Sequence, residues 1–374
     1  MKAIILTISA GGGHHTPTKA IDAHFKELGI ETVMIDAYKY FNVFLSNTVE
    51  KGYLLSTKYA PALYGGFYRI AEKRTNVDID MKFGGMGTSI VFKQFVKFVQ
   101  KQNADVVIAT HIFAAELLTM MREKNVIDAT LIGIITDFTI HPFWEETNLD
   151  YYVTASELLN YQMHKKNIGT SKILPFGIPI HPKFSVKMPK EEAREQLGIK
   201  NKTTVMVMTG SMGYGSVFKY IKALDESPME FQLVCVCGNN KKLKKRLDNY
   251  ISKKDMLVFG FATNVDVIMD AADYLVTKPG GLSVSEALAK GLPLILIDPI
   301  PGQEDRNQEF LLNAGVALAV TKTHPVDEAI YQIMNNKAKE EVLPKIIEGL
   351  SKPFAGRELG EFVLGLKNNS SVSN

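Results

Sequence analysis

The sequence predicts an α/β protein built from two consecutive doubly wound domains. Three observations lead to this class. Apolar strand-like segments alternate with segments of 3.6-residue periodicity, the same alternation starts again after a proline-rich stretch, and a glycine-rich loop follows the first strand of each half. The length of 374 residues also exceeds what one core usually organises, so two domains are expected.

The first half, residues 1–180, contains five strand-like segments. In order they are KAIILTIS, TVMIDAY, ADVVIAT, ATLIGIIT and DYYVTAS. The helical periodicity between them favours a parallel sheet wrapped by helices. Prolines at positions 175, 179, 182 and 189 then interrupt regular structure, and we expect the interdomain linker at 181–190.

The second half, residues 191–350, repeats this organisation with TTVMVMTGS, FQLVCVCG, MLVFGF, ADYLVTK and LPLILID. The final segment, 351–374, is expected to form a helix over FAGRELGEFVLGL and a flexible tail, NNSSVSN. Ligands of parallel sheets bind beyond the carboxyl ends of the strands. Two such sheets facing each other would therefore define a cleft.

The composition is that of a soluble globular protein. Hydrophobic residues make up 46% and charged residues 22%, and no apolar run approaches the roughly 18 to 20 residues that cross a bilayer. The opening MKAIILTIS is interpreted as the first buried strand of a cytoplasmic protein rather than a signal peptide. Cys235 and Cys237 lack the spacing of a metal or redox site, so we expect buried thiols.

The segment Thr277–Gln308 carries the clearest functional pattern. An apolar strand leads into Gly280 and Gly281, and a helix is expected to begin at Ser283. We expect the glycine pair to turn with positive φ and to expose backbone amides. The helix N-terminus would add its partial positive charge, so this turn suits a diphosphate.

Polar residues after this turn allow two interpretations. Ser283 and Glu286 have the spacing of a capping box, but a carboxylate one turn into a diphosphate-binding helix can also reach ribose hydroxyls. Further on, Gln303, Glu304 and Asn307 crowd an expected loop after LPLILID. Their amides and carboxylate suit a hydroxyl-rich ligand, although a solvated loop has the same composition.

A histidine-bearing loop follows the first strand. Gly12, Gly13 and His14 precede an expected helix with Thr16 as N-cap and Pro17 at its first position. The loop lacks the GK[ST] of a Walker motif and does not match GxGxxG. His14 is a candidate general base at the mouth of the cleft, whereas a surface histidine beside a flexible turn is the alternative.

The segment LIGIITDFTIHPFW is expected to line a second edge of the cleft. Asp137 follows a buried strand, and His141 and Trp144 come next on a loop. Asp137 can assist the base or cap the following segment. Trp144, the single tryptophan of the chain, is more often a packing residue than a ligand platform.

The glycine-rich loop of the second half contains Gly210, Ser211 and Gly213 after the strand VMVMT. Its amides can form an anion nest. The same glycines are common in αβ turns for packing reasons alone, so the loop by itself is weak evidence.

The segment 38–102 is basic and aromatic. Ten Lys and Arg oppose four Asp and Glu there, a local balance of +6 against +3 for the whole chain. SIVFKQFVKFVQK places three lysines along one helical face, which suits an anionic bilayer but also a helix docked on its own sheet. No RNA-binding signature accompanies these residues, so nucleic acid is not expected as a partner.

Four motifs in the same order resemble glycosyltransferase family 28. They are GGGHHTPTKAI, ITDFTIHPFW, LPFGIPIHPKF and TKPGGLSVSEALAKGLPLILIDPIPGQEDRNQ. They are most similar to the monogalactosyldiacylglycerol synthases of plants and the diacylglycerol glucosyltransferases of Gram-positive bacteria, and more distantly to the N-acetylglucosaminyltransferase that completes lipid II. The resemblance covers about residues 1–350. It implies the GT-B fold, with an N-terminal acceptor-binding and a C-terminal nucleotide-sugar-binding Rossmann-like domain facing each other across a cleft.

The resemblance also implies roles for individual residues. It assigns His14 and Asp137 to catalysis, with His14 deprotonating the acceptor hydroxyl, and it assigns to the acceptor side Gly12, Gly13, His141 and Trp144. The nucleotide sugar would be held by Gly210, Ser211, Gly213, Phe259, Gly260, Phe261, Gly280, Gly281, Ser283, Glu286, Gln303, Glu304 and Asn307. Within that set, residues 259–261 would contact the uracil edge, 303–307 the hexose, and Glu286 the ribose in addition to its capping role.

The implied enzyme is an inverting, metal-independent glycosyltransferase that moves a hexose from a UDP-sugar to diacylglycerol or a related lipid. It would need no cofactor beyond the UDP-sugar co-substrate. We expect a cytoplasmic protein that associates peripherally with the inner face of the cell membrane, with an anionic membrane surface among its partners. Two alternatives stay open: a UDP-sugar epimerase of similar fold, which would need no lipid, and a non-enzymatic UDP-sugar sensor.

Overall fold

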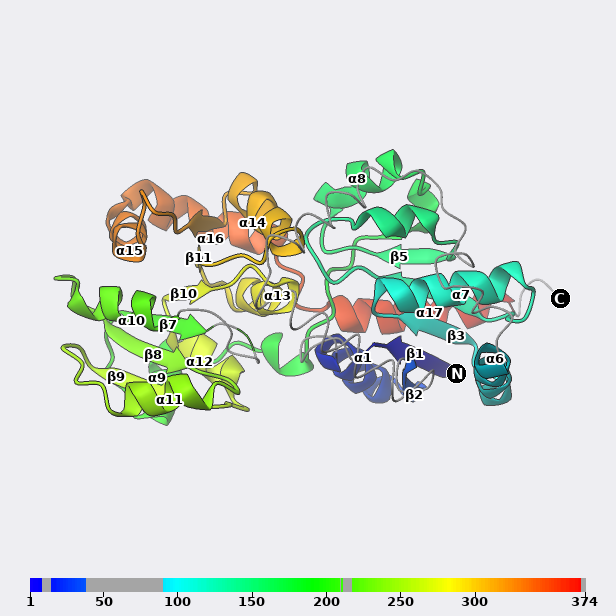
Figure 1. Ribbon diagram of the computed structural model, residues 1–374, viewed down its shortest axis with the longest axis horizontal. Helices are drawn as coiled ribbons and strands as arrows, with labels where there is room; N and C mark the ends of the chain where they lie inside the picture. The colour runs from blue at the N-terminus through cyan, green and yellow to red at the C-terminus, as the bar shows by residue number, and fades with distance from the viewer. Residues whose placement is uncertain (9–14, 38–89, 209, 211–216, 371–374) are drawn as a thin grey trace. The chain divides into compact units, whose positions relative to one another are not determined.

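The chain forms two compact α/β units (Figure 1). The structure is a computed structural model and describes residues 1–8, 15–37, 90–208, 210 and 217–370. The first unit comprises Met1–Pro182, Pro301–Gln303 and Phe354–Asn374, and the second comprises Lys183–Ile300 and Glu304–Pro353. Among the described residues each unit contains one six-stranded parallel sheet, which confirms the predicted α/β class with two Rossmann-like domains.

The sheet of the first unit has the strand order β2-β1-β3-β4-β5-β6, and every neighbouring pair is parallel. Its strands are β1 Lys2–Thr7, β2 Glu31–Asp36, β3 Val106–Ala109, β4 Thr130–Ile134, β5 Tyr151–Val153 and β6 Ile173–Leu174. Consecutive residues of β1 and β3 are buried, so both faces of these strands are covered. This burial explains why their sequences are continuous apolar runs rather than alternating patterns.

The helices of the first unit are α1 His15–Glu27, α6 Ile90–Gln102, α7 Ile112–Glu123, α8 Asn160–Lys165 and α17 Ala355–Ser370. The 3₁₀ turns η2 Pro142–Glu146, η3 Glu157–Leu159 and η4 Thr170–Lys172 lie between its later strands. α17 contributes to the core that surrounds β1, and the rings of Phe362 and Tyr151 meet edge to face with centroids 4.9 Å apart. The last helix of the chain therefore completes its first unit.

The start of α1 differs from the prediction. The helix begins at His15, so Thr16 and Pro17 lie within the first turn rather than at the N-cap and the first position. Proline is tolerated anywhere in this turn because its amide positions have no acceptor inside the helix. The sequence pattern therefore located the helix but not its first residue.

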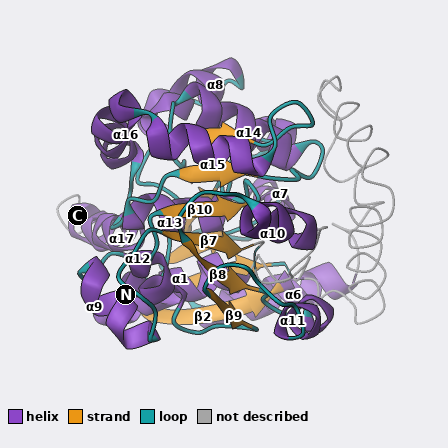
Figure 2. Ribbon diagram, turned by 90° about the vertical axis from the view of Figure 1, so that its left-hand side faces the viewer, coloured by secondary structure: helices purple, strands orange, loops and turns teal. Residues whose placement is uncertain are grey.

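The sheet of the second unit has the order β12-β11-β10-β7-β8-β9, again with parallel neighbours. Its strands are β7 Thr204–Met208, β8 Gln232–Val236, β9 Met256–Phe259, β10 Tyr274–Thr277, β11 Leu294–Leu296 and β12 Ala317–Ala319. The helices are α9 Lys190–Leu197, α10 Val217–Glu226, α11 Lys241–Asp248, α12 Val265–Ala271, α13 Gly281–Lys290, α14 Gln303–Asn313, α15 Val326–Asn335 and α16 Lys337–Leu350. Figure 2 shows α10 and α11 on one side of the strands and α9, α12 and α13 on the other.

The centre of the second sheet is fully buried and mostly apolar. Every residue of β7 and β8 is buried, including Cys235, and Cys237 directly after β8 is buried as a free thiol as well. Burial raises the pKa of both thiols, that of Cys237 to about 11. The prediction of buried thiols is confirmed, and the raised pKa values disfavour the reactive thiolate form.

Two edge strands escaped prediction. β6 has two residues and β12 has three, so neither is long enough to show a periodicity of its own. All ten strands that the sequence did predict are present. The missing strands extend each sheet at its edge and leave the position of the candidate site unchanged.

Candidate functional site

The turn between β10 and α13 has a different conformation from the predicted one. α13 begins at Gly281, two residues before Ser283, and Gly280 caps it in an extended conformation with φ −77° and ψ 134°. Neither Gly280 nor Gly281 has a positive φ. The predicted left-handed turn and the capping box of Ser283 with Glu286 are therefore wrong, because the chain enters the helix directly from extended backbone.

Gly280 leaves space in front of the N-terminus of α13. A Cβ on this residue would have a single heavy atom within 4 Å, Oε1 of Glu304 at 3.9 Å. The first N–H groups of a helix have no acceptor inside it and carry partial positive charge. The absence of a side chain at Gly280 thus lets an anion approach these donors closely.

The segment after β11 is a helix rather than the predicted loop. Gln303, Glu304 and Asn307 lie in the first turns of α14. Asn307 is fully buried and its Nδ2 donates to the carbonyl of Pro279 at 3.0 Å, while Ile300 N donates to Glu304 Oε2 at 2.7 Å. α14 therefore fixes the turn in front of α13 and places Glu304 beside Gly280.

Glu286 lies on α13, one turn beyond its start, and is partly buried. Burial of the carboxyl raises its pKa to about 8. The positive charge of Lys183 lowers the pKa in part, and the negative charge of Asp266 raises it by a smaller amount. Lys183 is held by other partners, since its Nζ lies 2.8 Å from Asp266 Oδ1 and donates to the carbonyl of Thr263 at 2.5 Å. The Glu286 carboxyl is therefore mostly protonated at neutral pH in this arrangement.

Other predicted donor residues lie at the same edge of the sheet, beyond the carboxyl ends of β7 and β9. Gly210, two residues beyond β7, has φ 70°, a backbone conformation that favours glycine. Phe259 ends β9, the Gly260 carbonyl accepts from Gly238 N at 3.1 Å, and Phe261 is 64% exposed. Ser211 and Gly213 lie outside the described residues.

The predicted acceptor motif follows β4 in the first unit. Asp137 lies three residues beyond β4 and, like His141, is partly exposed. His141 caps η2, where its Nδ1 accepts from Phe143 N at 3.2 Å. Trp144 is 4% exposed and its ring packs on Gly133, where a Cβ would come within 2.7 Å of it. Asp137 and His141 are thus accessible at this edge, whereas Trp144 supports the segment from inside.

The histidine loop with Gly12, Gly13 and His14 lies outside the described residues, as does most of the basic aromatic segment, 38–89. The described end of that segment is α6. Its apolar side chains, such as Phe92 and Phe95, are buried, and Lys93 and Lys97 are exposed. The amphipathic pattern of α6 is therefore that of a helix docked within the protein.

Two family models match the chain, and together they cover most of it. The model for monogalactosyldiacylglycerol (MGDG) synthase matches residues 14–180, and the model for the glycosyltransferase family 28 C-terminal domain matches residues 204–349. The chain belongs to glycosyltransferase family 28. The predicted family and enzyme class are thereby confirmed.

Curated relatives of this transferase match along nearly their whole length. A protein of Bacillus pumilus named processive diacylglycerol beta-glucosyltransferase is 29% identical over 373 residues, which cover 97% of this chain and 94% of the relative. The protein of that name from Bacillus subtilis is 27% identical over 359 residues, which cover 93% and 91%.

Solved structures share the fold of the transferase. Acinetobacter baumannii MurG superposes with a TM-score of 0.62 at 13% identity, covering 97% of this chain and 99% of MurG. The structure of S. aureus MnaA with UDP gives a TM-score of 0.58 at 13% identity, covering 96% and 95%. These likenesses identify the fold as GT-B, as predicted.

One group of hydrogen-bonded side chains near the donor edge of the transferase was not predicted from the sequence. Asp298, just after β11, has φ 41°, and its Oδ1 accepts from Tyr220 Oη at 2.5 Å and from Lys219 Nζ at 3.4 Å. Both partners lie on α10, which begins at Val217. Asp298 thus connects α10 to the turn after β11. A lone aspartate beside a proline resembles any turn, so the sequence offered no signal for this role.

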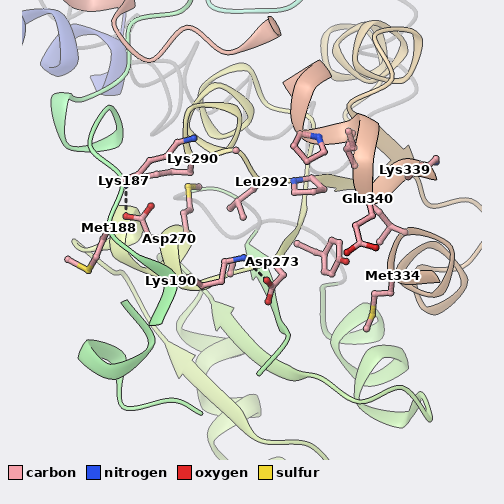
Figure 3. Close-up of a pocket in the computed structure, with 18 residues that line it drawn as sticks. Lys187, Met188, Lys190, Asp270, Asp273, Lys290, Leu292, Met334, Lys339 and Glu340 are labelled. Atoms are coloured by element: carbon pink, nitrogen blue, oxygen red, sulfur yellow. Dashed lines mark hydrogen bonds and ion pairs between the residues drawn. The ribbon is translucent and has the colours of Figure 1, made fainter. Parts of the chain in front are cut away.

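A pocket of about 460 Å³ in the transferase lies at the opposite edge of the second sheet (Figure 3). It is lined by the amino ends of β10 and β11, the C-terminal end of α13 and parts of α15 and α16. Lys290 forms a buried ion pair with Asp270 at 2.6 Å, and Lys190 pairs with Asp273 at 2.5 Å. The pocket therefore does not coincide with the donor edge.

No group of three or more His, Cys, Asp or Glu in the described part of the chain is arranged to hold a metal ion. No described helix is long and apolar enough to cross a membrane.

Proposed function

We propose that the chain is an inverting, metal-independent hexosyltransferase that moves a hexose from a UDP-sugar to diacylglycerol or a related lipid. The observation that carries this proposal is the N-terminus of α13, which is open at Gly280 and fixed by the bond from Asn307 to Pro279. Such a site suits a diphosphate. In this proposal Glu286, one turn further along α13, accepts from the ribose hydroxyls and Glu304 contacts the hexose.

The proposed reaction is a single displacement. His14 takes the proton of the acceptor hydroxyl while the hydroxyl oxygen attacks the anomeric carbon from the face opposite the diphosphate. The bond between the anomeric carbon and the diphosphate oxygen breaks, the configuration inverts, and UDP leaves with the bonding electrons. The N–H groups of the first turn of α13 stabilise the charge that develops on the leaving group, which is the role a metal ion serves in other transferases.

The acceptor is proposed from the family matches. The curated relatives are named as processive diacylglycerol beta-glucosyltransferases, and the family model that matches residues 14–180 is that of monogalactosyldiacylglycerol synthase. A lipid acceptor implies a protein that works at the membrane surface, so we include peripheral association with the cytoplasmic face in the proposal. Asp137 and His141 are the described side chains proposed for the acceptor side.

Labelled donors test the proposal. The protein is incubated with diacylglycerol in detergent micelles and with radiolabelled UDP-glucose, UDP-galactose or UDP-N-acetylglucosamine. The radiolabel recovered in the lipid extract is then measured. We expect one donor to label the lipid, with inversion seen in the product's anomeric coupling. Folded protein that binds UDP but labels no lipid would contradict the proposal. Release of an epimerised nucleotide sugar without lipid would support the epimerase instead.

A further inference from the structure

The segment of η3 and α8 in the first unit turns apolar side chains outward. Leu158 is 64% exposed and Tyr161 is 69% exposed. Leu159 and Met163, from the same turns, are fully buried and hold the segment on the unit. The segment therefore has apolar residues on both sides, and the outer ones are not needed for its own packing.

This segment is fastened to the predicted acceptor motif at two points. Gln162 Oε1 accepts from Ile140 N at 3.3 Å, and Lys166 Nζ lies 3.2 Å from Glu145 Oε2. The two contacts flank His141 and Trp144 in the sequence. Its first residues follow β5, the neighbour of β4, so it begins at the same carboxyl edge of the sheet as the acceptor motif.

The charge around the outer side chains is positive. Residues 157–172 contain three lysines and one acid, Glu157, and with Glu145, which pairs with Lys166, the local balance is +1. Two of the lysines are engaged: Lys166 with Glu145, and Lys172 with the carbonyl of Leu149 at 2.9 Å. Lys165 instead lies over the outward Tyr161, with Nζ 4.7 Å from the ring centroid.

We propose that the α8 surface, formed by Leu158, Tyr161 and Lys165, contacts an anionic lipid bilayer and holds the acceptor motif at the membrane. An aliphatic and an aromatic side chain beside a lysine match the interface of a bilayer, where apolar groups enter the acyl boundary and the cation stays among anionic headgroups. The inference deepens the proposed function, because a lipid acceptor has to be reached from the membrane surface. It assigns this contact to an element other than the basic segment 38–102.

A tryptophan reporter tests the contact directly. The native Trp144 is buried, so Leu158→Trp adds a surface probe, and Tyr331→Trp, at a 58% exposed site on α15 of the second unit, is the matched control. Each variant is mixed with phosphatidylglycerol vesicles that contain brominated lipid. We expect a blue shift and quenching for Leu158→Trp and neither for Tyr331→Trp, with much weaker effects on phosphatidylcholine vesicles.

Three results would overturn the inference. In the first, the protein sediments with vesicles but the Leu158→Trp probe is not quenched. In the second, both tryptophan probes are quenched equally. In the third, the protein does not bind anionic vesicles at all. The charge is tested separately by Lys165→Glu, which we expect to weaken vesicle binding roughly tenfold, whereas Lys242→Glu on α11 should have little effect. Equal effects of the two reversals would contradict a local role for Lys165.

Activity distinguishes this inference from the proposed function. The Leu158→Ser/Tyr161→Ser variant should lose about tenfold or more in transfer to diacylglycerol in vesicles and keep its transfer to dioctanoylglycerol in detergent. Tyr331→Ser should match the unmodified protein in both assays. Loss of activity in detergent would indicate damage to the site and contradict the inference. If the unmodified protein labels no lipid in detergent, the proposed function fails, while the probe result still decides the membrane contact.

Discussion

Glu286 is the side chain whose chemistry depends most on its surroundings. Burial raises its pKa to about 8, so at pH 7 the free protein holds a mostly protonated carboxyl one turn inside the proposed diphosphate site. A carboxylate accepts from two ribose hydroxyls, whereas the protonated form has less capacity to accept. The charged form is therefore expected to bind the nucleotide better.

UDP affinity should rise with pH through the titration of Glu286. Because the carboxyl is about one-tenth ionised at pH 7 and mostly ionised at pH 9, affinity is expected to increase about tenfold between them, with close to one proton released on binding at pH 7. Calorimetry in buffers of different ionisation enthalpy measures both quantities. Glu286→Gln should bind more weakly and without this pH dependence; a flat profile in the unmodified protein would remove Glu286 from the ribose site.

His14 and its neighbour allow a matched test of the proposed base. His14→Ala should leave UDP affinity unchanged and lower kcat by a factor of about 10² to 10⁴, the usual contribution of a general base. His15→Ala, at the first position of α1, should retain near-normal turnover. Steady-state transfer and UDP calorimetry on both variants separate the roles. Normal turnover in His14→Ala would assign the proton transfer to another residue.

The sequence predicted which residues belong to the donor site, but it did not predict the hydrogen bonds and the burial of their side chains. Gly280 and Glu286 stand out because a glycine pair after an apolar strand and a carboxylate one turn later form a local pattern. The bond from Asn307 to Pro279 and the raised pKa of Glu286 arise from segments distant in sequence or from burial. No local pattern contains that information.

At the scale of elements, the long buried strands were predicted and the starts of helices were not. β7 and β10 are apolar runs because their sheet is covered on both faces. α14 was mistaken for a loop although Gly302, with φ 103°, precedes an acidic first turn, which is a helix-start signal. The prolines before it favour a loop in the sequence, whereas in the structure Asn307 of this helix is buried and bonded to the Pro279 carbonyl.

The link between α10 and the turn after β11 should stabilise the donor edge. Tyr220→Phe removes the hydrogen bond to Asp298 and is expected to lower the free energy of unfolding by about 1 to 2 kcal/mol and to raise the KM for the donor more than it changes kcat. Urea denaturation and donor kinetics measure these effects. Lys219→Met removes the longer, exposed contact with Asp298 and the cation–π contact with the Tyr220 ring, and it should cost about 1 kcal/mol or less. Unchanged stability and KM in Tyr220→Phe would show that the link has no role.

At the scale of the whole molecule, the sequence predicted two α/β domains, but not the unit in which the last helix lies. The apolar periodicity of α17 indicates a helix with a buried face and does not say against what it packs. The structure places it with residues 1–182, against α1. Small residues at the contact carried a signal, since Gly356 and Gly360 stand one turn apart where a Cβ would meet His24 and Leu28.

The fit between α17 and α1 can be tested by two glycine substitutions on the same helix. Gly356→Ala would bring a Cβ within 2.2 Å of His24 Cδ2, and that ring is buried and bonded through Nε2 to the carbonyl of Ile180 at 3.0 Å. Overpacking should outweigh the helix propensity gained, so the free energy of unfolding of the first unit should fall by about 1 to 2 kcal/mol. Gly365→Ala meets no atom within 4 Å and should raise it by up to about 1 kcal/mol.

Hydrogen exchange locates these effects, because it reports the stability of each element separately. Gly356→Ala should speed exchange in α1, α17 and β1 and leave β7 and β8 unchanged. Burial also lowers the pKa of His24, so its neutral form is favoured in the folded unit. The contact therefore contributes stability above pH 6.5 that is lost as the pH falls below it, and the same elements should show faster opening in mild acid. Equal responses to both alanine substitutions would mean that α17 is held by its apolar side chains alone, without the close approach at Gly356.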